Sequence, residues 1–168
     1  GGNDGLKLTF LDNSPPDEVF ETDSNDKTFN FQVIVMAENM GENKISGGDL
    51  KVDLKGISAS DFGVTGNLDT KLTQRNTEEL TPVSKNTQGD VRRGSLEQLT
   101  FPDNGNEDFA YTTIKVDQSF DFVAEACYKY KTTAISQVCL KKDLRSTDNE
   151  ICDLTGSKPV TNSGAPMH

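Results

Sequence analysis

The densest group of side chains with metal-binding chemistry follows Pro102, where oxygen-bearing residues succeed one another in a short polar loop. The candidate ligands are Asp103, Asn104, Asn106 and Asp108. Ca²⁺ takes about six to eight oxygen ligands, which carboxylates and amides on a tight loop can supply. The glutamate that closes an EF-hand loop is missing from its expected position, and an Asn/Gly turn explains the same composition. We therefore keep two interpretations of this loop, a calcium site and a plain turn, and the same two for residues 21–26.

Groups suited to catalysis are scarce. The only histidine is His168, the last residue of the sequence, so triads, dyads and zinc clusters that depend on histidine are excluded. Ser24 and Lys27 have the Ser-x-x-Lys spacing, but that pair requires a helical turn, and here it lies in a polar turn before a strand. None of the glycine-rich phosphate-binding or nucleophile-elbow motifs occurs. We therefore expect that the protein is not an enzyme.

Three cysteines raise the question of a disulfide: Cys127, Cys139 and Cys152. We favour a bond between Cys139 and Cys152, which would close a polar loop of about 13 residues and contribute roughly 3 kcal/mol in the chain-entropy model. The alternatives are a Cys127–Cys139 bond across a hairpin and three reduced thiols in the core of a cytosolic protein. A catalytic thiol is not expected, because no internal histidine or Cys-x-x-Cys pair is present to lower its pKa.

Charge and hydropathy exclude two classes of partner. Lys and Arg number 17 against 27 Asp and Glu, which gives a net charge of −10. Nucleic acid is not expected as a partner, because phosphate contacts require clustered Lys and Arg. The longest apolar run is 33–37, whereas a transmembrane helix needs about 20 apolar residues. We therefore predict no transmembrane segment.

In the segments that must position these residues, apolar residues recur mainly with a period of two, which is typical of strands. The clearest strand is 29–37, in which every second residue is apolar on one face. The strands that we predict are 6–10, 29–37, 50–55, 97–101, 110–116, 120–131, 134–140 and 150–154. The segment 134–140 is expected to return as the hairpin partner of 120–131. One helix is considered, at 77–83, where Pro82 limits its length.

Short strands with frequent turns predict an all-β fold, an immunoglobulin-like antiparallel β-sandwich of about seven to nine strands. We expect one domain over residues 1–168, with strand-donating termini. The stretch 66–94 is polar and is expected to be a long surface insertion, or alternatively a contact arm or edge strand.

Both ends of the sequence resemble a known group of proteins. The similar segments are 126–132, 138–140, Cys152, 163–166, 5–10, 14–20 and the Glu38–Gly41 turn. They are similar to poorly characterised archaeal cell-surface proteins with immunoglobulin-like, CARDB-type domains, which often carry a lipobox-like leader. The similarity is poor over 57–100. The resemblance implies an extracellular or cell-surface location and a lipid anchor upstream of Gly1.

We expect an extracellular structural protein, the subunit of a self-assembling cell-surface filament, tube or array. In this hypothesis a terminal strand of one copy, 6–11 or 159–168, adds to the sheet of a neighbour, so that a homo-oligomer forms through terminal or edge strands. The alternative is a monomeric adhesion or ligand-binding domain of a lipid-anchored surface protein, with loops 57–66 and 102–109 as its binding surface. Neither hypothesis implies a cofactor other than calcium.

Overall fold

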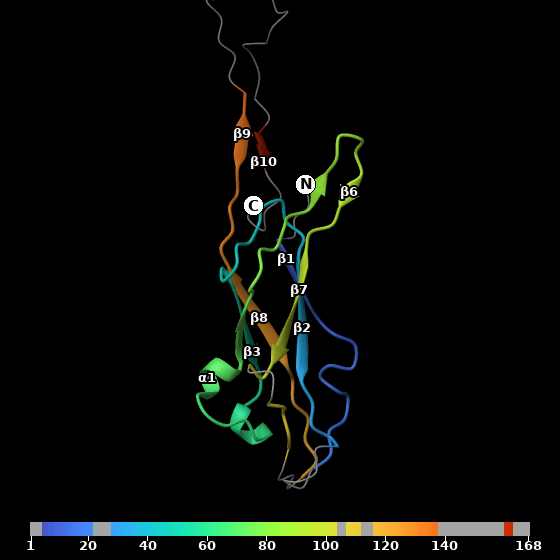
Figure 1. Ribbon diagram of the computed structural model, residues 1–168, viewed down its shortest axis with the longest axis vertical. Coiled ribbons are helices and arrows are strands. Elements are labelled where there is room, and N and C mark those ends of the chain that lie inside the picture. Colours follow the sequence, from blue (N-terminus) through green and yellow to red (C-terminus); the bar gives the residue numbers. More distant parts are fainter. Residues whose placement is uncertain (1–4, 22–27, 104–106, 112–115, 138–159, 163–168) are drawn as a thin grey trace, which may run out of the picture.

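The computed structural model describes residues 5–21, 28–103, 107–111, 116–137 and 160–162, and most of its regular elements are strands (Figure 1). The elements are β1 (Leu6–Phe10), β2 (Val33–Asn39), β3 (Leu50–Lys55), the 3₁₀ helix η1 (Ala59–Phe62), α1 (Leu68–Lys71), β4 (Thr73–Arg75), β5 (Ser84–Lys85), β6 (Val91–Arg92), β7 (Leu96–Phe101), β8 (Val123–Tyr128), β9 (Ala134–Ser136) and β10 (Val160–Asn162). The expectation of a mostly β chain with antiparallel sheets is confirmed. Within these ranges no helix is long and apolar enough to cross a membrane.

Two three-stranded antiparallel sheets form the body of the molecule, with strand orders β1-β2-β7 and β4-β3-β8. Successive side chains of a strand point to opposite faces of a sheet, and the burial of β2 alternates accordingly along its seven residues. The inward side chains of the two central strands are 0–2% exposed: Val33, Val35, Ala37, Leu50, Val52 and Leu54. These residues join the two sheets in one hydrophobic core.

Part of the polar stretch 66–94 belongs to a sheet, at the edge position that the alternative interpretation of this stretch considered. Its strand β4 pairs with β3 at three positions. Leu80 and Ile45 exchange two backbone hydrogen bonds of 2.8 and 3.0 Å, and both side chains are 1% exposed. The prediction of a helix at 77–83 is wrong. The bridge between Ile45 and Leu80 and the burial of both side chains override local helix propensity.

A further expectation that proves wrong is the hairpin between 120–131 and 134–140. β8 pairs with β3, whereas β9 pairs with β10 over three residues. Residues 129–137 contain no Gly, Pro, Asn or Asp, the residues that usually reverse a chain between strands. The chain consequently runs on past β8, and β9 and β10 form a two-stranded ribbon that projects beyond the sheets (Figure 1).

The predicted strand 110–116 is not observed at its described positions. Ala110, Tyr111 and Val116 lie outside strands, while residues 112–115 lie outside the described ranges. Phe109, the residue just before this segment, forms an isolated bridge with Phe31. The predicted strand 150–154 also lies outside the described residues.

Candidate functional site

The outer edge of β8 is the most prominent candidate for an interaction. β8 is the last strand of its sheet and pairs with β3 along all six of its residues. No other described strand pairs with β8. An edge strand of this kind presents a row of backbone donors and acceptors to which another chain can pair. We call the outward side of Val123–Tyr128 the β8 edge.

The backbone groups that face this edge follow from the alternation of an antiparallel ladder. Leu54 N donates to a carbonyl oxygen on the β4 side of β3, at 2.8 Å. The direction of the backbone N–H and C=O groups alternates from one residue to the next. The backbone groups of Asp53 therefore point toward β8, where the partner of Asp53 is Glu125. The N–H and C=O groups of the neighbouring Ala124 and Ala126 therefore point away from β3, toward the β8 edge.

The hydrophobic core reaches the surface along the same side. β1 is the outer strand of the facing sheet. The inward side chains of β1 and β8 are only partly buried: Leu6, Leu8, Ala124, Ala126 and Tyr128. At the opposite margin β7 closes the core with Leu99 and Phe101, which are 3% and 0% exposed. All four outer strands of the two sheets have an unpaired edge, but burial of the core is incomplete at the β1–β8 margin and complete at the β7 margin.

Tyr128 and Tyr130 close one end of this margin. The Tyr128 hydroxyl is hydrogen-bonded to the backbone of Leu6, and partial burial, followed by the nearby Tyr130, raises the pKa of Tyr128. The two rings meet edge to face, with centroids 5.9 Å apart. A Cβ atom at Gly5 or Gly41 would collide with one of the two hydroxyls. The open part of the margin is therefore the segment from Val123 to Ala126.

The outward face of β8 carries both charge and apolar surface. Glu125 accepts a hydrogen bond from Lys55 of β3 at 2.5 Å, which raises the pKa of Lys55. Val123 is 50% exposed. Cys127 is an exposed free thiol, so it does not form the Cys127–Cys139 bond considered above. The favoured pair, Cys139 and Cys152, lies outside the described residues, and that disulfide stays a prediction.

The candidate calcium loop is described only in part. Asp103 is exposed and Asp108 is partly buried, whereas Asn104 and Asn106 lie outside the described residues. Glu107 is engaged by its neighbours: Lys71 Nζ donates to Oε2 at 2.6 Å, and Thr65 donates to Oε1. The hydrogen bond from Lys71 is the main cause that lowers the pKa of Glu107. In the described part of the chain no group of three or more His, Cys, Asp or Glu side chains is placed to hold a metal, and calcium stays a prediction.

Phe122 and Tyr128 both pack against the hydrophobic core, but they belong to different groups of aromatic rings. Six residues of strand extend about 20 Å at roughly 3.3 Å per residue, so Phe122 and Tyr128 lie at different ends of β8. Phe122 belongs to an aromatic cluster centred on Phe62. The signal that could have found this cluster is the density of four aromatic residues in 109–122.

Comparisons of the chain with protein-family models, with curated proteins and with solved structures gave no match. The features of the molecule that bear on its function are the β8 edge, the partly buried margin beside it and the projecting β9–β10 ribbon.

Proposed function

We propose that the protein is an extracellular structural subunit, without enzymatic activity, that assembles with copies of itself into a surface filament, tube or array by β-strand addition. The observation that carries this proposal is the β8 edge, where unpaired backbone groups coincide with a partly open core. A strand added there would bond to the backbone of Ala124 and Ala126. Its alternate side chains would cover the inward residues of β1 and β8.

The sheet orders fit an immunoglobulin-like sandwich in which strands D and G have no counterpart among the described strands, and we adopt that topology as part of the proposal. β1, β2 and β7 correspond to strands A, B and E, and β3 and β8 to strands C and F. In a complete sandwich of this type strand G lies beside strand F. The position of strand G is the β8 edge, and we propose that another copy fills it.

The donor is the segment 159–168. The other terminal segment considered, 6–11, contains β1, which pairs with β2 at five positions inside a main sheet, whereas β10 pairs only with β9, at three positions and outside both main sheets. The described part of 159–168 is β10, which belongs to a ribbon that extends away from the sheets (Figure 1). Ile135 of this ribbon is 62% exposed. A projecting ribbon at one end and an open edge on the side of the same subunit support contact between neighbouring copies.

A peptide competition experiment tests this function. Negative-stain microscopy and sedimentation of the purified chain should show filaments, tubes or sheets. A synthetic peptide of residues 159–168, added in excess before assembly, should occupy the β8 edge and leave dispersed subunits, whereas a scrambled peptide should not. If the untreated chain stays dispersed at monomer size, the proposal is refuted and the monomeric binding domain becomes the better hypothesis. Assembly that the peptide leaves unchanged would refute the assigned donor.

A further inference from the structure

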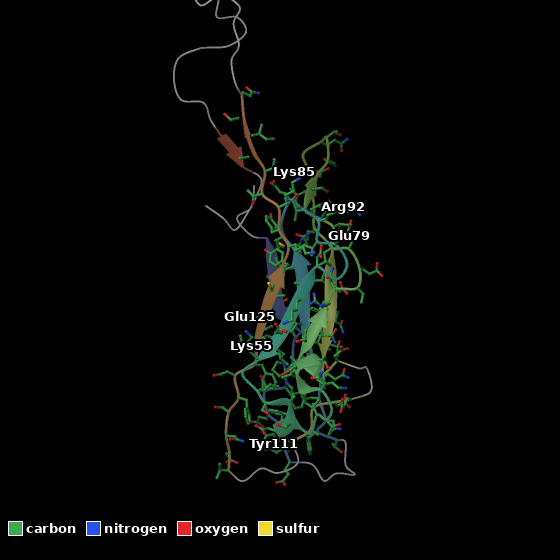
Figure 2. The ribbon with its side chains drawn as sticks, turned by 90° about the vertical axis from the view of Figure 1, so that its left-hand side faces the viewer. Lys55, Glu79, Lys85, Arg92, Tyr111 and Glu125 are labelled. Carbon is green, nitrogen blue, oxygen red and sulfur yellow. The ribbon has the colours of Figure 1, made fainter. Side chains whose placement is uncertain are left out.

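A concave pocket of about 540 Å³ lies at the end of the molecule remote from the β9–β10 ribbon. Figure 2 shows Tyr111, which lines the pocket, at this end. Residues 15–21 and 117–120 line its sides, and aromatic rings from distant parts of the chain line it as well: Phe31, Phe62, Tyr111, Phe120 and Phe122. The volume is in the range of roughly 300–1,000 Å³ that is typical of small-molecule sites.

The rings form one cluster around Phe62. The Phe62 centroid lies 5.0 Å from that of Phe120, 5.2 Å from that of Tyr111 and 5.9 Å from that of Phe122, each in an edge-to-face arrangement. Phe62 is 3% exposed, whereas the other three rings are only partly buried. Aromatic surface thus remains accessible in the pocket, and the negative face of an aromatic ring attracts cations.

The charged residues that line the pocket are all acidic: Asp17, Glu18, Glu21 and Asp117. No Lys or Arg is among the lining residues. None of the four carboxylates forms an ion pair within the described part of the chain, where the ion pairs lie elsewhere. Aromatic surface and unpaired negative charge therefore meet in one concavity, and both favour a cation.

We propose that this pocket binds an organic cation, specifically a quaternary ammonium group with alkyl substituents. Such a group needs no hydrogen-bond acceptor, and the aromatic side chains of the pocket offer few. The hydroxyl of Tyr111, the one polar atom of the aromatic cluster, already accepts a hydrogen bond from the Gln118 amide. Where it faces the rings, a primary ammonium or a guanidinium group would lose its hydrogen bonds to water, whereas alkyl groups pack on them. The carboxylates that line the pocket attract either kind of cation by charge.

Choline and its neutral carbon analogue, 3,3-dimethylbutan-1-ol, provide a direct test by isothermal titration calorimetry on the full chain. They share shape and differ in charge. Choline is expected to bind one site per chain, with an affinity roughly 5- to 30-fold higher than that of the alcohol, the range that a cation–π contact supplies. Absence of choline binding at 10 mM, or equal affinities for both compounds, would overturn the proposal.

Two variants locate the site. Phe120→Leu keeps an apolar side chain but removes an aromatic ring, and is expected to weaken choline binding by about 5-fold or more while changing the affinity for the alcohol less. Glu79→Gln is the control, because Glu79 is an exposed carboxylate that does not line the pocket and lies well away from Tyr111 (Figure 2). Choline binding that Phe120→Leu leaves unchanged would place the site elsewhere and refute the assignment. Thermal unfolding of each variant verifies that it is folded, and Tyr111→Leu repeats the test if Phe120→Leu is not.

Discussion

Replacing Ala126 by proline should prevent strand addition at the β8 edge while leaving the subunit folded. The N–H group of Ala126 points away from β3, so its loss removes no hydrogen bond of the β3–β8 ladder. Proline is tolerated on an edge strand when its position faces solvent in this way. In the assembly, however, the same N–H group would donate to the incoming strand, and the proline ring would lie where that strand must pair.

The size of the effect follows from the hydrogen bond that is lost. One such bond contributes about 0.5–1.5 kcal/mol net, which corresponds to a roughly 2- to 12-fold rise in the critical concentration for assembly. Contact between the ring and the donor strand adds to this. We therefore expect the critical concentration of Ala126→Pro, measured by sedimentation across a dilution series, to rise about 10-fold or more.

Gln98→Pro is the matched control at the opposite margin. Ile34 accepts a hydrogen bond from Leu11 on the β1 side of β2. By the same alternation the backbone groups of Met36, two residues further along β2, also point toward β1. Its partner on β7 is Gln98, whose N–H group therefore points away from β2 and outward from β7. Gln98 is exposed, and no described strand pairs with the outer edge of β7. This variant should assemble with the critical concentration of the unmodified chain.

Equal critical concentrations for Ala126→Pro, Gln98→Pro and the unmodified chain would refute the reasoning, because the β8 edge would then not be the contact. Circular dichroism and urea unfolding verify that each variant is folded. Should Ala126→Pro fail to fold, Ala124→Pro repeats the test at the other residue of β8 whose N–H group points toward the β8 edge.

Three further predictions follow from charge and thiol chemistry. Because a hydrogen bond from Lys71 holds the pKa of Glu107 below its usual value of 4.5, this pair stabilises the fold above that pH and loses its contribution as the pH falls through the lowered pKa; urea unfolding at pH 7 and pH 3 should show a smaller pH dependence for Glu107→Gln. A net charge of −10 opposes close packing of copies, so assembly should strengthen with salt or divalent ions, and a turbidity series that is unchanged by a chelator at low salt would contradict this. A maleimide should label one thiol per native chain, Cys127, and three after unfolding and reduction, as detected by mass spectrometry; three labels without reduction would exclude the Cys139–Cys152 disulfide.

The sequence alone determined which segments are strands where alternation is strong. In 33–37 and 50–54 every second residue is apolar, and the inward residues of these strands are buried. A period of two is local information, because it depends only on neighbours along the chain. For the same reason 134–136 was correctly predicted as strand although its partner was not.

Strand partners and the state of an edge were decided only by the tertiary structure. Alternation does not encode which strand lies alongside another, and so the sequence left 6–11 and 159–168 as equal donors. Only the structure shows that 6–11 holds β1 in a main sheet, whereas β10 pairs with β9 outside both main sheets. The partial burial of Ala124 and Ala126 likewise depends on what lies beside them in space.

The end pocket was beyond sequence reasoning for a similar reason. Phe31, Phe62 and Phe122 line it from segments that are far apart in the sequence, and no local pattern brings them together. The sequence supplied aromatic residues and acidic charge, each of which has an ordinary explanation on its own. The two packed sheets bury the core at the β7 margin and leave a concavity at one end of the molecule. Only this packing brings the aromatic rings and the acidic side chains together around the concavity.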